Sequence, residues 1–226
     1  MIVCSAAVLG LVAGACGGYL VQADREPTRL PPLSQPALAR AEGDAPVRLP
    51  AAQDRRVRTD GDLRKLLLKK PQGARDAEWL EATDGWLDAA SYADTYGAPA
   101  EKYEQLIHDE FRRAAITAWE VGDSYSVEIR LVQYREEEVL AALESSDDNR
   151  HWASWPDTVG RAIPGTGDGE AFVHQRTETE PGQGQAYEAE AYAWRGDIAM
   201  EVLISSGKPV SKKQIMDVAE RQMERL

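Results

Sequence analysis

The chain has 226 residues, 43% of them apolar, which suits one sizeable folded domain with additional segments. Its 38 Asp and Glu residues outnumber 26 Lys and Arg residues, for a formal net charge of −12 at pH 7. An acidic chain repels phosphate backbones and gains no attraction to anionic lipid headgroups, so we expect no nucleic-acid partner. Both cysteines, Cys4 and Cys16, lie in the first apolar segment, so the rest of the chain has neither a disulfide nor a thiolate metal site.

Residues 1–23 carry no charged side chain and are rich in Val, Leu, Ala and Gly. As a helix rising about 1.5 Å per residue, such a segment reaches across a hydrocarbon core of about 30 Å. We therefore expect residues 1–23 to be a transmembrane or signal-type segment, and retention as one uncleaved span is the leading interpretation. Two alternatives stay open. Val21-Gln22-Ala23 resembles a signal-peptidase site, and Ala13-Gly14-Ala15-Cys16 loosely resembles a lipobox in which Cys16 carries the lipid.

The charges around this segment bear on its orientation in the membrane. Arg25, Arg29 and Arg40 follow the segment and no basic residue precedes it, which taken alone favours a cytoplasmic C-terminal domain. We expect the opposite orientation, with a single-pass anchor in the cell membrane and the folded domain outside the cytoplasm. This expectation includes a basic cytoplasmic stub upstream of Met1.

Residues 24–57 are predicted to be a disordered tether. They are rich in Ala and Arg and show neither a helical nor a strand period, so they bury too little apolar area to offset the entropy of ordering. Such a segment holds a domain away from a bilayer. Its prolines are Pro27, Pro31, Pro32, Pro36, Pro46 and Pro50.

The extracytoplasmic domain is expected to cover residues 58–226 and to begin with a helix near residues 62–69. Thr59 and Asp60 are its candidate N-caps. Residues 74–97 are predicted to form short helical or irregular pieces whose aromatic side chains cover the core. The apolar stripe of the first helix consists of Leu63, Leu66 and Leu67.

A second helix is predicted over residues 99–114, with Pro99 at its first position. Strands follow at residues 116–121 and 125–134, because apolar and polar side chains alternate strictly in the second of them. Another helix is expected near residues 136–144. The shared apolar face of the 99–114 helix carries Tyr103, Leu106, Ile107 and Phe111.

The second half of the domain is predicted to be strand-rich and to close with a helix. Residues 171–178 are one candidate strand, and residues 186–194 and 198–204 form a hairpin that turns at Arg195-Gly196-Asp197. The final helix begins at Ser211, with Gln214 completing a capping box. Its buried face consists of Ile215, Ala219, Met223 and Leu226.

These elements predict an α+β fold. We expect a curved antiparallel sheet of about four or five strands with helices packed on one side, preceded by the N-terminal membrane segment.

The residues give little sign of catalysis. None of the three histidines, His108 on the second helix, His151 in a loop and His174 on a strand, has metal-ligand spacing, and no serine lies in a GxSxG elbow. We therefore expect no catalytic residue, no cofactor and no metal, and predict that the protein is not an enzyme.

Two tryptophans of the 152–156 segment are candidate binding residues. Trp152 and Trp155 are either packed in the core or line an aromatic groove that takes a small apolar ligand.

Several stretches, taken together, resemble a group of uncharacterised actinobacterial membrane-anchored or secreted proteins. More distantly, the arrangement is similar to the extracytoplasmic sensor domains of mycobacterial serine/threonine kinases and to related lipoproteins. The resemblance implies a curved antiparallel sheet flanked by helices and ligand sensing in a groove. Those kinase domains are stapled by disulfides, whereas residues 58–226 contain no cysteine. The stretches are RTDGDLRKLLLKKP (58–71), EFRRAAITAW (110–119), VEIRLVQY (127–134), IPG (163–165) and WRGD (194–197).

The sequence thus predicts a non-enzymatic, membrane-tethered extracytoplasmic domain of binding or sensor type. Its expected partners are the membrane, through residues 1–23, and a protein or a small molecule of the cell envelope. The alternative is a lipid-binding or carrier lipoprotein, which predicts a hydrophobic cavity and lipidation at Cys16. An apolar cavity in the structure would favour the carrier, and an exposed groove would favour the binding domain.

Overall fold

The computed structural model describes residues 60–80, 82, 84–122, 125–135, 140–154, 158–174 and 186–226, together with Gly14, Cys16, Gly18, Tyr19 and Ala23. The chain divides into two units, Met1–Pro46 and Val47–Leu226. The described residues of the first unit are all helical. Among the described residues, no helix combines the length and the apolar character needed to cross a membrane. The predicted tether, residues 24–57, lies outside the described residues.

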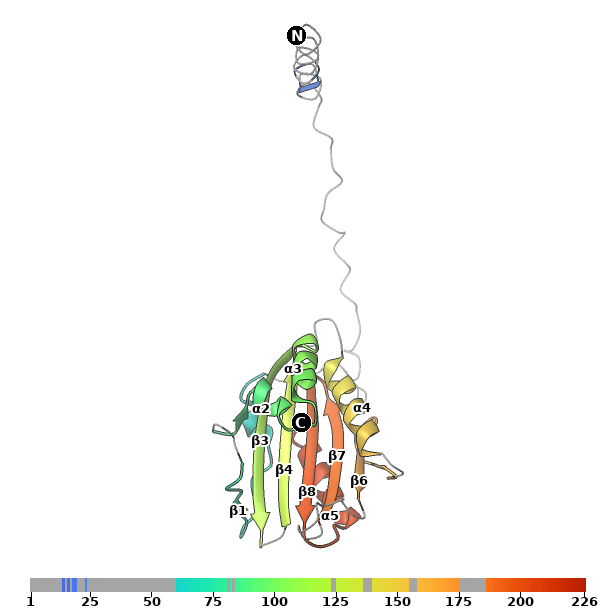
Figure 1. The fold of residues 1–226 in the computed structure, drawn as a ribbon. Coiled ribbons are helices and arrows are strands. Elements are labelled where there is room, and N and C mark those ends of the chain that lie inside the picture. The colour runs from blue at the N-terminus through green and yellow to red at the C-terminus, as the bar shows by residue number, and fades with distance from the viewer. Residues whose placement is uncertain are drawn as a thin grey trace, which may run out of the picture. The chain divides into compact units, whose positions relative to one another are not determined.

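A single antiparallel sheet forms the centre of the second unit (Figure 1). Within the described residues it has eight strands in the order β1-β3-β4-β8-β7-β6-β5, and β2 also pairs with β3. The strands are β1 (Arg75–Asp76), β2 (Trp86–Leu87), β3 (Phe111–Val121), β4 (Tyr125–Tyr134), β5 (Arg161–Ala162), β6 (Glu170–Val173), β7 (Tyr187–Arg195) and β8 (Ile198–Ser206).

The predicted number of four or five strands was too low. The five longer strands match the predicted ones, whereas β1, β2 and β5 have two residues each. A pair of residues shows no alternation, so these short strands leave no period in the sequence. The predicted β7–β8 hairpin is confirmed, with Gly196 in the turn at a φ of 58°.

Helices cover both faces of the sheet, where one covered face was predicted. They are the 3₁₀ helix η1 (Leu63–Leu66) and the α-helices α2 (Ala89–Ala93), α3 (Pro99–His108), α4 (Ala141–Ala153) and α5 (Lys212–Met223). On one face, here called the α5 face, η1 and α5 pack on the odd-numbered residues of β4, such as Ile129. On the other face, α2, α3 and α4 pack on even-numbered residues such as Val132. Figure 1 shows α5 across the sheet from the other three α-helices.

The central strand β8 explains why one covered face is insufficient. Ile198, Met200, Val202 and Ile204 point into the core under α5, and Ala199 points into the core under α2 and α4. Val202 and Ala199 are 0% and 1% exposed. A strand that is buried on both faces needs cover on both faces.

The first two predicted helices are shorter than expected. The helix predicted over residues 62–69 is the 3₁₀ turn η1, and its N-cap is Asp62, whose side chain accepts from the N–H of Arg64. The helix predicted over 99–114 ends at His108, because Glu110 adopts a φ of 57°, a left-handed conformation that stops a helix. Its predicted apolar face was wrong in part. Leu106 is buried, Phe111 belongs to β3, and Tyr103 and Ile107 are exposed.

The helix predicted near 136–144 is α4, which ends at Ala153. Its sheet-facing side includes the small polar residues Ser145, Ser146 and Asn149, so an apolar stripe does not reveal its length. The closing helix is confirmed. Ser211 caps α5 in a full capping box, and its Ile215, Ala219 and Met223 are buried.

Candidate functional site

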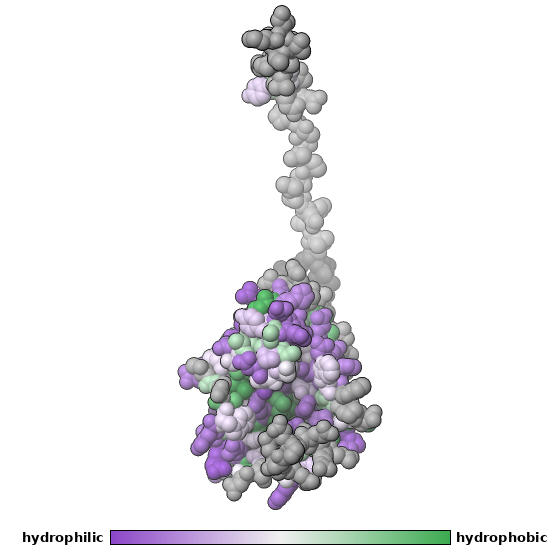
Figure 2. Space-filling view, in the orientation of Figure 1, coloured by the Kyte–Doolittle hydropathy of each residue, from purple (hydrophilic) through white to green (hydrophobic). Residues whose placement is uncertain are grey.

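The face of the sheet opposite α5 carries a concentration of glutamates. Strand pairing aligns Glu128 with Leu203 and Glu190, and Ser126 with Ser205 and Glu188. We call this side the glutamate face; it carries Glu120, Glu128, Glu188, Glu190 and Glu201. Figure 2, in the orientation of Figure 1, shows hydrophilic side chains prominent on the side of α2, α3 and α4.

The covered half of the glutamate face is built around the buried carboxylate of Glu201, which is 2% exposed. The hydroxyl of Tyr92 donates a hydrogen bond to Oε1 of Glu201, and the Tyr96 hydroxyl lies 3.2 Å from the same atom. Nδ2 of Asn149 donates to this oxygen at 3.1 Å. Nη1 of Arg130 lies 3.4 Å from Oε2. Both carboxylate oxygens therefore have partners, as a buried charge requires.

The environment of Glu201 holds the neighbouring phenols in their neutral form. Burial, and then the charge of Glu201, raise the pKa of Tyr92 well above its usual value. The same two causes raise the pKa of Tyr96. Both tyrosines therefore stay protonated and act as hydrogen-bond donors to the carboxylate.

Arg130 connects the covered half to the open half. Its Nε donates to Oε1 of Glu128, and its Nη1 donates to the hydroxyl of Thr95 at 3.0 Å. Burial alone would lower the pKa of Arg130, but the charges of Glu201 and Glu128 outweigh burial and raise it. Arg130 is thus a permanent cation between two carboxylates.

The open half of the glutamate face contains a pocket of about 200 Å³. Polar and acidic side chains from β4, β7 and β8 line it together with apolar residues, and Trp79 borders it from the segment between β1 and β2. The lining residues are Trp79, Ser126, Glu128, Glu188, Ala189, Glu190, Leu203, Ile204 and Ser205.

Trp79 is held at the pocket edge by a hydrogen bond. Its indole Nε1 donates to Oε1 of Glu120 at 3.1 Å, and Nη2 of Arg75 lies 3.4 Å from Oε2 of the same carboxylate. The Trp79 side chain nevertheless remains 49% exposed. An aromatic ring fixed beside carboxylates in this way can present its face to a ligand.

The two glutamates of β7 differ in their surroundings. Glu190 accepts from the Tyr192 hydroxyl at 2.7 Å and lies 3.4 Å from Nε2 of His174. Burial opposes the charge of Glu190, but these two contacts prevail and lower its pKa. Burial, and then the charge of Glu190, raise the pKa of Glu188. Within the described residues, no hydrogen bond or ion pair reaches the Glu188 carboxylate. A cation in the pocket would relieve this unfavourable charge.

A hydroxyl, an imidazole and a carboxylate occur in series beside the pocket. Oγ1 of Thr158 lies 3.4 Å from Nδ1 of His174, and Nε2 of His174 lies 3.4 Å from Glu190. This order is that of a hydrolase relay. However, the contact with Glu190 outweighs burial and raises the pKa of His174, which favours the protonated ring. A protonated imidazole cannot take a hydroxyl proton, so the series acts better as a structural ion pair.

Of the residues selected from the sequence as candidates, Cys16 and Trp152 are described, and neither lines this pocket. Cys16 is an exposed free cysteine in the first unit. Trp152 was expected in a loop but lies on α4, where it is 71% exposed and its ring meets the ring of His151 edge-on. Trp155 lies outside the described residues. The predicted groove near Trp152 and Trp155 therefore stays a prediction.

His108 ends α3 and is exposed, and His174 directly follows β6. Across the described ranges, no group of three or more His, Cys, Asp or Glu side chains could hold a metal ion.

The pocket residues could have been suspected from alternation. Glu128 alternates with Val127 and Ile129 along β4, as Glu188 and Glu190 do with Ala189 along β7. From the alternation in residues 125–134 we predicted only a strand. That these positions meet in one pocket depends on strand pairing, which alternation does not supply.

Comparison with known proteins adds no identification, because no family model, curated protein or solved structure matches this chain.

Proposed function

We propose that the protein is a non-enzymatic, membrane-tethered extracytoplasmic domain of binding or sensor type, and that the pocket of the glutamate face binds a compact organic cation. The observation that carries this proposal is the pocket itself, where Trp79 borders Glu128, Glu188 and Glu190. Carboxylates attract a cation, and an indole face adds a cation–π contact. The anchoring part rests on the uncharged residues 1–23 and the proline-rich residues 24–57.

The size of the pocket limits its ligand. A volume of about 200 Å³ is below the roughly 300–1,000 Å³ of sites for drug-sized molecules. A pocket of this size suits one ammonium group with short substituents. The ammonium group can be a free small molecule or the end of a longer molecule. Glu188 is the residue most able to hold such a charge, because it lacks a described ion-pair partner.

The charge of the pocket supports a binding domain over a lipid carrier. A carrier needs an enclosed apolar cavity, whereas this pocket is small and three carboxylates, those of Glu128, Glu188 and Glu190, share its lining with apolar residues. The two cores on either side of the sheet are filled by side chains such as Ile129 and Tyr134, both 0% exposed. Apolar acyl chains would gain little in such a site.

Calorimetric titration of the full chain in detergent micelles tests the proposal. The probe is choline, and the reference ligand is 3,3-dimethylbutan-1-ol, which has the same shape without the charge. We expect choline to bind and the alcohol not to bind. Trp79→Ala and Glu188→Gln should each weaken choline binding about tenfold, the effect of losing one desolvated cation–π or charge contact.

The matched control is Glu104→Gln, the same chemical change on the exposed surface of α3. It should leave choline binding unchanged. Equal binding of choline and the alcohol, or equal affinity of the wild type and Glu188→Gln, would overturn the proposal. Cell fractionation tests the anchoring part separately, since a soluble cytosolic product with its first residues intact contradicts it.

A further inference from the structure

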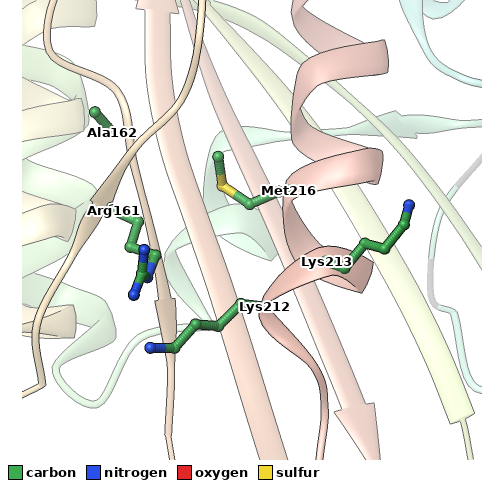
Figure 3. A pocket seen from close by; sticks show the side chains of 5 residues that line it. All are labelled: Arg161, Ala162, Lys212, Lys213 and Met216. Carbon is green, nitrogen blue, oxygen red and sulfur yellow. The ribbon is translucent and has the colours of Figure 1, made fainter.

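A second pocket lies on the opposite side of the sheet, between β5 and the start of α5. Its volume is about 440 Å³, and it is lined by Arg161, Ala162, Lys212, Lys213 and Met216 (Figure 3). The register explains why Arg161 takes part. Arg161 pairs with Ala171, which packs into the core under α5, so Arg161 lies on the α5 face.

Two of the three cations of this pocket converge on it. In Figure 3 the side chains of Arg161 and Lys212 lie close together, whereas Lys213 extends away on the far side of the α5 backbone. The Nζ atom of Lys213 forms an ion pair with Asp217, one helical turn further along α5. Arg161 and Lys212 therefore form a pair of their own, which we call the cation pair.

The cation pair has no counterion within the described residues. No ion pair or hydrogen bond joins either side chain to a described carboxylate, and both residues are exposed. By contrast, Arg64, Arg130 and Arg150 each contact at least one carboxylate. In a chain with twelve more acidic than basic residues, two cations that lack a described counterion and are directed at one pocket form a distinct site.

Lys212 lies at the end of α5 where a positive charge is unfavourable. Lys212 and Lys213 are the first two residues of α5, and the first turn contains no acidic residue. The N-terminal end of a helix carries partial positive charge, so cations there are unfavourable for folding. Lys213 offsets this cost through its ion pair with Asp217, whereas Lys212 has no described acidic partner, and such an unrelieved conflict is expected at a functional site.

We propose that the pocket between β5 and α5 binds a phosphate group, held by the cation pair. The Arg161 guanidinium offers two parallel N–H donors to phosphate oxygens, and Lys212 adds a second positive charge. Met216 supplies an apolar surface beside the two cations, which suits a phosphate carried on a glycerol or acyl body. The site lies across the sheet from the glutamate face and is independent of the function proposed there.

Lysine footprinting of the full chain in liposomes tests this site. The acylation rate of Lys212 is measured by mass spectrometry, with Lys213 on the same helix as the internal reference. One arm compares phosphatidylglycerol with phosphatidylcholine liposomes; the other adds glycerol phosphate to phosphatidylcholine liposomes. We expect Lys212 to be protected severalfold and Lys213 to be unaffected. Protection in the first arm alone assigns a lipid headgroup as the source, and protection in the second assigns a soluble phosphate.

Charge reversal supplies the variants. Arg161→Glu should abolish the protection of Lys212, and Lys212→Glu should weaken glycerol phosphate binding in calorimetry by at least about tenfold. The matched control is Lys69→Glu, which makes the same charge change at an exposed lysine outside the pocket lining and should retain binding. Because a carboxylate is favourable in the first turn of a helix, Lys212→Glu should fold normally. Protection of neither lysine, equal protection of both, or equal loss of binding in Lys69→Glu would overturn the proposal.

Discussion

Arg130 on β4 and Glu201 on β8 are direct cross-strand partners, with Nη1 of Arg130 3.4 Å from Oε2 of Glu201. Their side chains are 12% and 2% exposed. Attraction between charges so far removed from water is strong, and so is the cost of leaving one of them alone. Removing either partner of this ion pair should therefore destabilise the centre of the sheet.

The first prediction concerns removal of the carboxylate. Glu201→Ala leaves Arg130 buried with only Glu128 as a counterion and deprives Tyr92 and Tyr96 of their acceptor. We expect the free energy of unfolding, measured by urea titration, to fall by about 3–5 kcal/mol. Glu104→Ala on the exposed surface of α3 is the control and should change it by less than about 0.5 kcal/mol. A small loss in Glu201→Ala, equal to that of the control, would contradict the role of the pair.

The second prediction concerns alkaline pH. Burial raises the pKa of Tyr92, Tyr96, Tyr134 and Tyr192 above the usual value of 10.0. The folded state then keeps protons that the unfolded state releases, so this stabilisation is present below about pH 10 and declines as the pH rises further. The lowered pKa of Lys102 has the opposite effect on stability, but it is one group against four tyrosines.

We therefore expect stability to fall steeply above about pH 10, and phenolate absorbance of the four tyrosines to appear only together with loss of the folded circular dichroism signal. Tyr192→Phe should make the fall less steep. Ionisation of all tyrosines in a chain that stays folded would disprove the prediction.

The third prediction concerns His174. Its contact with Glu190 raises its pKa above 6.5, so the stabilisation it provides is fully present below about pH 6.5 and is lost as the pH rises through the folded pKa. We expect a nuclear magnetic resonance titration of the imidazole to give a value above 6.5. Glu190→Gln should lower this value, whereas Glu144→Gln on α4 should not. A wild-type value at or below 6.5 is the opposing result.

The fourth prediction concerns Gly169, which precedes β6. A Cβ atom placed there would lie 2.7 Å from Cβ of Ala193, a fully buried residue of β7. Gly169→Ala should therefore lower the free energy of unfolding by about 1–3 kcal/mol through overpacking. Gly97→Ala is the matched control, because nothing lies within 4 Å of its added Cβ. Equal stability of the two variants in thermal unfolding would show that β6 shifts freely.

The parts of the fold that could be predicted are those with a clear local period. The bounds of β4 coincide with the alternating segment 125–134, and the capping box at Ser211 and Gln214 marked the start of α5. The end of α3 could not be predicted, because the left-handed conformation of Glu110 has no signature in the residue type. Likewise, Ser145 and Ser146 face the sheet from α4 although their polarity indicates an outward position.

The candidate sites were harder to foresee than the strands. Alternation assigns Glu128 and Glu188 to one side of their strands, but only the order β4-β8-β7 brings them to one pocket. In the same way, Arg161 and Lys212 are far apart in sequence and meet because β5 lies beside the start of α5. Both pockets are therefore products of long-range pairing.

The place of β8 in the sheet has a consequence for how the chain is made. Its two neighbours are β4 and β7, and its Glu201 accepts from Tyr92 across a separation of 109 residues. Until β8 emerges, β4 has no partner on one side and Tyr92 of α2 lacks its carboxylate acceptor. Such distant closure is slow. We therefore expect the centre of the sheet to close only after residues 198–206 have been synthesised.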